Sequence, residues 1–309
     1  MWFTWHLNGK GVWTASLLSF FVILALVLIQ LRVPKRICTK ASLYTILIAL
    51  SGLAVIIINQ AHFIRESVNP GRHSDILIAL RKFTLTRACD FLRQFFPTIM
   101  DLLVFSDCIN RYILIYYPQR KSLALSWKFL MISMGCILGI SSLIAAMAAR
   151  LEHEIHTYNT IYNVDIILAL FHPGSLAKKT LLYLVVLKGT ISIAISGFFI
   201  VITARICRVL NKGVQFLKES HAGSESIARY SKVMRFSFIL CIIVVVFNFI
   251  LDSIDLGLMA WMKLYSLNFI SHISFSKMHK ISVGRSFLKT IFSLKPGFYG
   301  LAYIWIKLS

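Results

Sequence analysis

The chain has 309 residues, of which 58% are hydrophobic and 15% are charged. Its apolar residues come in blocks of roughly twenty, long enough to cross a bilayer, which excludes an ordinary soluble domain and predicts a multi-pass, all-α membrane protein. The formal net charge of +21 would suggest a nucleic-acid partner in a soluble protein. Here Lys and Arg lie between the apolar blocks, as in loops that face anionic lipid, so we expect no nucleic-acid partner.

The first two apolar blocks predict membrane helices at residues 12–31 and 41–64. Residues 1–11 precede them and carry one cation, Lys10, whereas a basic cluster follows the first block. A secretory signal peptide has the opposite order. Because basic residues tend to stay on the cytoplasmic side, residues 1–11 are expected to be an extracellular N-terminus.

A third span is expected at residues 88–117 and a fourth at residues 129–149. The third is unusually polar in its first half. The fourth contains Gly135 and Gly139, which are four residues apart on one helical face and could permit close packing on a neighbouring helix. The next stretch, residues 150–179, has nearly balanced charges and fits an extracellular loop.

The fifth and sixth spans are expected at residues 181–204, interrupted by Lys188, and at residues 236–251. Between them, residues 205–235 contain seven basic side chains and two acidic ones. We therefore expect a cytoplasmic loop that contacts the anionic inner leaflet.

The seventh helix is predicted at residues 258–275 or at residues 286–306. In the first case a transmembrane domain over 12–275 is followed by a basic C-terminal tail over 276–309. In the second case the last helix lies within that tail. The abundance of Lys, Ser, Ile and Phe in this region is also consistent with an incorrectly assigned chain end. The charge alternation predicts a seven-helix bundle in the plasma membrane, with its N-terminus outside and its C-terminus in the cytoplasm.

The third span ends in Asn110-Arg111-Tyr112-Ile113-Leu114-Ile115-Tyr116-Tyr117-Pro118. This stretch resembles the Asp-Arg-Tyr-x-x-Ile-x-x-Pro motif of rhodopsin-like G-protein-coupled receptors, and the Asn-Arg-Tyr form is similar to that of divergent invertebrate chemosensory receptors. The resemblance implies a receptor without a catalytic site or cofactor, in which Arg111 contacts a heterotrimeric G protein. Tyr112 would support Arg111, Ile115 and Pro118 would shape the following loop, and Asn110 stands where an acid is usual.

Other marks of that family are missing. The sixth span has Asn248-Phe249-Ile250 where Cys-Trp-x-Pro is expected, and Lys295-Pro296-Gly297-Phe298-Tyr299 replaces Asn-Pro-x-x-Tyr. The second span has Ser51 or Gly52 at the place of the usual aspartate. The resemblance therefore covers the layout of the helices but only one motif closely.

Asp107 supplies a carboxylate that Asn110 cannot. It lies four residues before Arg111, which is the favourable helical order for an acid and a base. We expect Asp107 to be the partner that restrains Arg111 in the resting state.

The polar half of the third span forms one helical stripe, because its members recur at spacings of three or four residues. These residues are Asp90, Arg93, Gln94, Pro97 and Asp101. Arg93 lies eighteen residues before Arg111, on the same face. In amine receptors of the resembled family an aspartate at this position binds the ligand's ammonium group. Arg93 therefore favours an anionic or carbonyl-bearing small molecule or peptide over an amine.

Alternatives to a ligand pocket stay open at the same residues. Asp90 and Arg93 could pair with each other, and Asp101 could serve packing or bind water. Lys188 and Asn248 are further pocket candidates, although a lysine such as Lys188 more often extends toward the membrane interface.

Three other protein classes compete with the receptor interpretation. A transporter with Asp101 and Asp107 as coupling carboxylates is the main alternative, and it predicts helices broken at the midplane. A membrane enzyme would need a nucleophile elbow or a His-rich helical motif, and the chain has neither. Its acidic and His run at residues 152–156 does not have the spacing of a complete metal site. A receptor that has lost its function is the last alternative.

Overall fold

The structure is a computed structural model that describes residues 2–31, 40–67, 84–117, 126–162, 176–219, 224–254 and 275–308. All regular structure within these ranges is helical. The elements are α1 (Trp2–Leu31), α3 (Lys40–Ser67), α5 (Thr84–Tyr116), α7 (Trp127–Tyr162), α9 (Leu176–Glu219), α10 (Ser224–Val244), the π-helix η2 (Val245–Leu251) and α12 (Phe275–Leu308). Because α10 continues directly into η2, these elements make seven helices in the described part of the chain.

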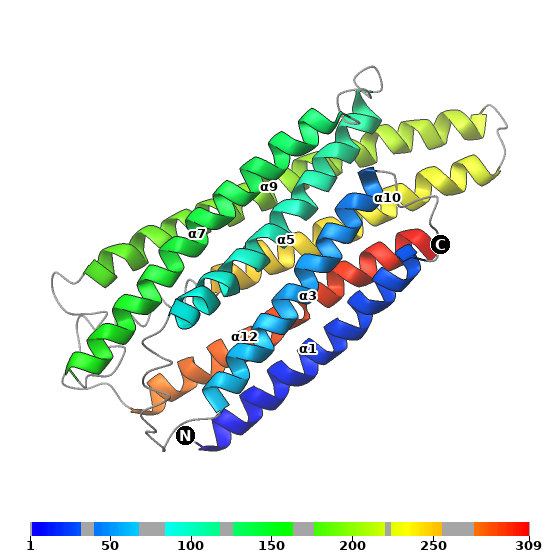
Figure 1. Ribbon diagram of the computed structural model, residues 1–309. Coiled ribbons are helices and arrows are strands. Elements are labelled where there is room, and N and C mark those ends of the chain that lie inside the picture. The colour runs from blue at the N-terminus through cyan, green and yellow to red at the C-terminus, as the bar shows by residue number, and fades with distance from the viewer. Residues whose placement is uncertain are drawn as a thin grey trace.

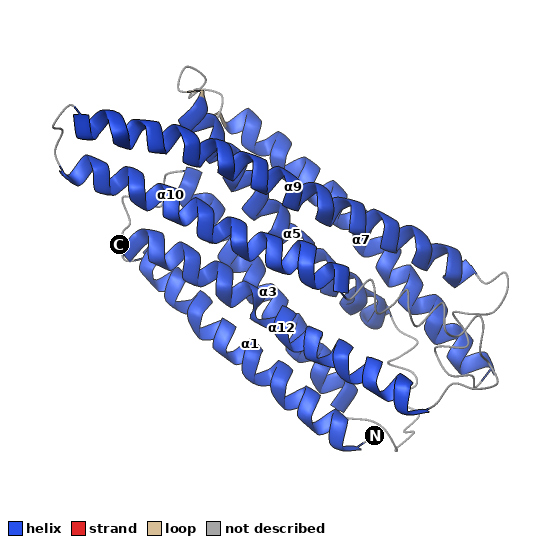
Figure 2. Ribbon diagram, turned by 180° about the vertical axis from the view of Figure 1, so that it is seen from behind, coloured by secondary structure: helices blue, strands red, loops and turns tan. Residues whose placement is uncertain are grey.

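The helices run side by side in one elongated bundle (Figure 1, Figure 2). Neighbours in sequence pack against each other from α1 to α9, and α12 returns to pack along α1 and α10, which closes the bundle. Helix α5 lies between α3, α7 and α9. Its position makes α5 the element around which the polar groups of the interior gather.

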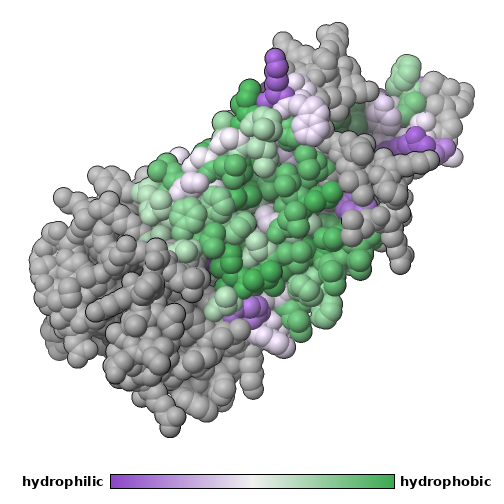
Figure 3. All heavy atoms as spheres, viewed as in Figure 1, coloured by the Kyte–Doolittle hydropathy of each residue, from purple (hydrophilic) through white to green (hydrophobic). Residues whose placement is uncertain are grey.

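Five of the helices in the described ranges are long and apolar enough to cross a membrane. The apolar stretches are Gly11–Gln30, Leu43–Ala61, Trp127–Met147, Gly189–Glu219 and Ser224–Ile254. Large apolar side chains such as Ile132, Leu143 and Phe198 are more than half exposed, and a hydrophobic band covers the middle of the molecule (Figure 3). A soluble protein rarely exposes so large an apolar surface. These are the features of a helical membrane protein.

The remaining two helices, α5 and α12, carry charged side chains along their length and each contains an internal proline, Pro97 and Pro296. Each helix nevertheless continues through its proline without interruption. Neighbouring helices in a bundle can satisfy the backbone groups that a proline frees, which makes such prolines tolerable.

Several helices extend beyond the predicted membrane spans. Helix α7 continues to Tyr162, and within the expected cytoplasmic loop at residues 205–235 the described residues, 205–219 and 224–235, are helical. The prediction of a loop there was wrong because basic residues were taken as the limit of a span. Arg, Lys, Leu and Gln are good helix formers, and no proline interrupts this stretch. The expected N-terminal extension is likewise helical from Trp2.

The C-terminal residues form the last helix of the bundle, α12. Helix α12 contains the candidate at residues 286–306 and packs along α1, so residues 275–308 are a structured part of the bundle. Apart from Phe275, the other candidate, at residues 258–275, lies outside the described residues.

The close helix packing expected at Gly135 and Gly139 of α7 does not occur there. A Cβ added to Gly135 or Gly139 would meet no atom within 4 Å, because both glycines face away from the bundle. Close packing occurs instead between α12 and α1, where a Cβ on Gly297 would lie 2.9 Å from Ser19 Oγ and 3.2 Å from Ser19 Cα. Ser19 Oγ also donates a hydrogen bond to the carbonyl of Ser293 across this interface, at 2.9 Å. Because Gly297 has no side chain, the backbones of α12 and α1 can approach each other closely here.

Candidate functional site

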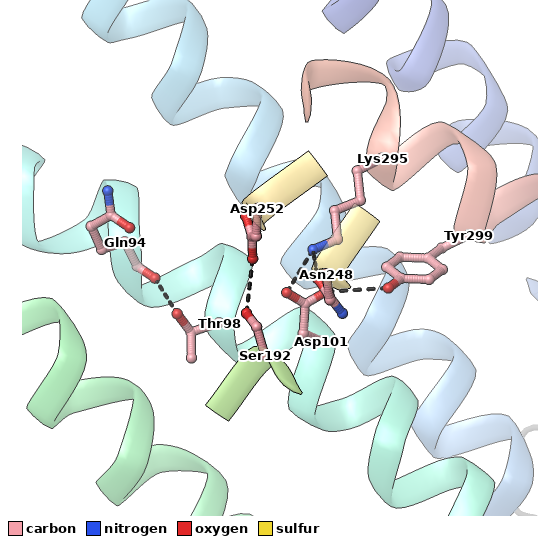
Figure 4. Close-up of polar contacts among 8 residues, drawn as sticks. All are labelled: Gln94, Thr98, Asp101, Ser192, Asn248, Asp252, Lys295 and Tyr299. Carbon is pink, nitrogen blue, oxygen red and sulfur yellow. Dashed lines mark hydrogen bonds and ion pairs between the residues drawn. The ribbon is translucent and has the colours of Figure 1, made fainter. Parts of the chain in front are cut away.

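The first polar cluster joins α5, η2 and α12 near the middle of the bundle. We call it the Lys295 cluster, and it consists of Asp101, Asn248, Lys295 and Tyr299. Lys295 Nζ lies 2.6 Å from Asp101 Oδ2 and donates to Asn248 Oδ1, also at 2.6 Å. Tyr299 donates from its hydroxyl to Asp101 Oδ1 at 3.2 Å. These side chains converge from three elements (Figure 4).

The Lys295 cluster is electrically balanced. Lys295 is 9% exposed and Asp101 is 16% exposed at the side chain. A charge in such a position is very costly unless it is paired and hydrogen-bonded. Each charge here has the other as its partner, and each also has a neutral hydrogen-bonding group. The arrangement explains how an apolar bundle tolerates an ammonium and a carboxylate in its interior.

A second cluster lies further along the same two helices. We call it the Arg111 cluster, and it consists of Asp107, Arg111, Phe236 and Tyr303. Asp107 Oδ2 accepts hydrogen bonds from Arg111 Nε at 3.0 Å and from the Tyr303 hydroxyl at 2.7 Å. The guanidinium carbon of Arg111 lies 4.4 Å from the centre of the Phe236 ring, within the range of a cation–π contact.

The Arg111 cluster ties three helices together at one end of the bundle. Asp107 and Arg111 belong to α5, Phe236 to α10 and Tyr303 to α12. The Tyr303 ring also packs edge-on against Phe236, with 5.4 Å between the ring centres. Phe236, Asp107 and Tyr303 are almost fully buried, whereas the Arg111 side chain is 22% exposed. The charged group nearest the surface is therefore the arginine.

The aromatic end of α5 contacts a different helix. Arg205 of α9 donates a hydrogen bond from Nη1 to the Tyr112 hydroxyl at 3.2 Å. The Tyr112 ring is stacked on Tyr116 and lies edge-on to Tyr117. Tyr116 and Tyr117 are themselves exposed, so this end of the helix presents aromatic rings at the surface.

A further polar contact joins α9 to the helical turn that follows η2. Ser192 donates to Asp252 Oδ2 at 2.8 Å. On α5, the hydroxyl of Thr98, three residues before Asp101, donates to the backbone carbonyl of Gln94 at 2.8 Å. Figure 4 shows Gln94 and Thr98 standing apart from the Lys295 cluster.

The sequence-predicted switch residues other than Tyr112, whose hydroxyl accepts the hydrogen bond from Arg205, fall into three groups. Asp107 and Arg111 form the expected pair. Asn110 is buried, and its Oδ1 accepts no hydrogen bond from the described residues, while Ile115 packs against the hydrophobic core. Pro118 lies outside the described residues.

The predicted pocket residues are only partly brought together. Asp101 and Asn248 meet at Lys295, whereas Arg93, Gln94 and Pro97 are partly buried elsewhere along α5. Asp90 and Lys188 lie within described helices, but their side chains are outside the description. The described residues contain no group of His, Cys, Asp or Glu that could hold a metal ion.

Three central residues were missed by the sequence reasoning: Lys295, Tyr299 and Tyr303. From the sequence, Lys295 and Tyr299 belong only to the stretch that replaces Asn-Pro-x-x-Tyr, and Tyr303 has no expected role. The signal that could have found them is their spacing. They recur every four residues in an otherwise apolar stretch, which places all three on one face of a helix.

Comparison of the chain with models of known protein families found no match, and comparison with curated proteins found none either.

Proposed function

We propose that this chain is a seven-helix receptor in the plasma membrane that transmits the binding of an extracellular ligand to a heterotrimeric G protein. The observation that carries the proposal is the Arg111 cluster. It holds the arginine of a receptor-like motif between a carboxylate of its own helix and an aromatic ring of the sixth helix. In this proposal all seven helices cross the membrane, with the N-terminus outside.

The Arg111 cluster suggests how such a receptor is kept inactive. Arg111 is held by Asp107, and Asp107 is held in turn by Tyr303. A movement of α10 away from α5 would remove Phe236 from the guanidinium and open the cytoplasmic end of the bundle. The ligand would act by binding the open state more tightly than the closed one. The basic ends of α9 and α10 would then flank the opening and touch anionic lipid.

The ligand class follows from the polar stripe of α5. Arg93 is a partly buried cation on the half of α5 that leads away from the Arg111 cluster. It favours a ligand with a carboxylate, another anionic group or a carbonyl, and it disfavours an amine. The ligand is expected to be a chemosensory small molecule or a neuropeptide.

The test is G-protein activation in cells with a panel of Gα subunits. Wild type, Arg111→Ala and Lys128→Ala are compared at matched surface expression. Lys128 is an exposed cation at the start of α7, so its replacement controls for the loss of one charge. A basal or ligand-evoked signal that is lost only with Arg111→Ala supports the receptor. A signal unchanged by Arg111→Ala would refute the role of Arg111.

A transporter is the second candidate, and the Lys295 cluster is the observation that favours it. A buried carboxylate that pairs with a lysine on another helix could exchange that lysine for a transported cation or proton. This candidate predicts substrate uptake that is abolished by Asp101→Asn. In its disfavour, the described helices continue past their prolines rather than breaking as many transporter helices do.

A further inference from the structure

The sixth helix changes its winding next to the Lys295 cluster. It runs continuously through α10 and η2, but the seven residues Val245–Leu251 form a π-helix. The backbone is α-helical at both flanks, with φ −62° and ψ −46° at Val244 and φ −62° and ψ −39° at Asp252. A π turn holds about one residue more than an α turn, and such turns are frequent at functional sites. No proline or glycine lies within these residues to explain it.

The π turn brings two distant residues of this helix onto one face. Phe236 and Asn248 are twelve residues apart, which in a regular α-helix would place them about 120° from each other. Both are nevertheless buried toward α5 and α12, where Phe236 covers Arg111 and Asn248 accepts the bond from Lys295. The extra residue in η2 reduces the effective spacing to about eleven residues, close to three full turns. The π winding of η2 therefore brings both contacts toward the same side of the helix.

The residue before Asn248 shows what regular winding would produce. Phe247 lies eleven residues after Phe236, so an α-helical η2 would turn Phe247 toward the face that Asn248 now occupies. At present Phe247 packs against Phe292 and Phe298 of α12, with 6.5 Å and 5.7 Å between ring centres. The Asn248 side chain is held through its Oδ1, which accepts the hydrogen bond from Lys295 at 2.6 Å.

We propose that η2 is a register switch that couples the Lys295 cluster to the Arg111 cluster. When Lys295 holds Asn248, η2 stays a π-helix and Phe236 stays on Arg111. When that bond is lost, η2 winds as an α-helix, and α10 turns by about 100°, the angle of one residue, which moves Phe236 off Arg111. This inference goes beyond the receptor proposal, because the same coupling would operate in a transporter.

The coupling is tested by a distance measurement that needs no G protein. Spin labels are placed at Arg235→Cys on α10 and Lys128→Cys on α7, two exposed positions, in the full chain with its other cysteines replaced, reconstituted in nanodiscs. A side chain about 5 Å from the helix axis moves by roughly 8 Å when the helix turns by about 100°. The inter-label distance is measured by pulsed electron paramagnetic resonance.

Two variants should move the label on α10. Asn248→Leu removes the amide that Lys295 holds. The double variant Asp101→Leu with Lys295→Met removes the ion pair as a unit, which proteins commonly tolerate, and so provides the test if Asn248→Leu does not fold. Ile250→Leu is the control, since Ile250 belongs to the same π turn but is exposed. The control should leave the distance as in the wild type.

Deleting Val246 tests whether the π turn of η2 is the element that couples the two clusters. This deletion removes the extra residue, so an α-helical turn keeps both contacts, and adding Asn248→Leu to it should no longer shift the distance. Two results would overturn the proposal. One is an unchanged distance in the folded Asn248→Leu or ion-pair variant. The other is a shift of the same size when Asn248→Leu is combined with the deletion.

Discussion

At the scale of single residues, the interior of this bundle is organised by two carboxylates on one helix. Asp101 and Asp107 of α5 each bind a cation and a tyrosine hydroxyl. Each tyrosine comes from α12, so the same helix contributes to both clusters. Charges in an apolar interior are tolerated only when they are paired and hydrogen-bonded in this way. The loss of one group should therefore destabilise the groups that remain.

The Lys295–Asp101 pair should show this dependence directly. Lys295→Met leaves a buried carboxylate without its cation, and removing one partner of a buried pair costs roughly 3–5 kcal/mol. The double variant Lys295→Met with Asp101→Leu should recover most of that loss. Thermal unfolding in nanodiscs measures both effects. A double variant that is less stable than the single one would show that the pair is not an isolated unit.

Tyr303 should restrain Arg111 through Asp107. Tyr303→Phe keeps the ring against Phe236 but removes the hydroxyl that donates to Asp107, a bond to a charged group worth about 1.5–3 kcal/mol. We expect higher basal G-protein signalling, and Asp107→Ala should raise it further. Equal basal signals in wild type, Tyr303→Phe and Asp107→Ala would mean that Asp107 does not hold the resting state.

At the scale of helices, the sequence predicted the spans better than their ends. The apolar blocks located six helices, because a run of apolar residues has few other uses in such a chain. The ends were misplaced because the helices continue past the apolar run on charged residues, as α9 does to Glu219. The polar face of α12 was missed because its residues lie in a region that the sequence marks as a basic C-terminal tail. Only the neighbouring helices, which supply Asp101 and Asn248, show why that helix holds a lysine in its interior.

The packing of α12 on α1 should be sensitive to a single methyl group. Gly297→Ala would place a Cβ 3.2 Å from the backbone Cα of Ser19, and forcing extra volume into a packed contact costs about 1–3 kcal/mol. Gly139→Ala is the matched control, since its Cβ would enter open space and alanine favours the helix. The melting temperature should fall for the first and stay or rise for the second. The opposite order would contradict this packing.

At the scale of the whole molecule, charge and apolar surface divide the bundle along its length. The hydrophobic band covers the middle (Figure 3), and exposed cations lie toward the C-terminal end of α9 and the N-terminal end of α10, namely Arg208, Lys212, Arg229 and Arg235. In membrane proteins such an excess of Lys and Arg is typical of the cytoplasmic side, so we expect these ends to face the cytoplasm. The sequence alone indicated this distribution, because it depends on composition rather than on side-chain contacts. It could not indicate the two clusters, which depend on contacts between residues up to about two hundred positions apart.

The orientation can be tested at the two ends of the sixth helix. Ser226→Cys and Ser253→Cys lie at exposed positions about 40 Å apart along the helix. In cells expressing a version without other cysteines, a membrane-impermeant maleimide should label Ser253→Cys directly and Ser226→Cys only after permeabilisation. The reverse pattern would invert the proposed topology and place the Arg111 cluster outside the cytoplasm.

The most direct test of the receptor proposal is nucleotide exchange on purified Gα subunits by the reconstituted protein. Wild type, Tyr303→Phe and Arg111→Ala are compared at equal protein content in nanodiscs. We predict faster exchange with Tyr303→Phe than with wild type for at least one Gα class, and none above empty nanodiscs with Arg111→Ala. The receptor account is wrong if folded, monodisperse Tyr303→Phe gives no nucleotide exchange with any Gα class. It is also wrong if Arg111→Ala gives the same exchange rate as Tyr303→Phe.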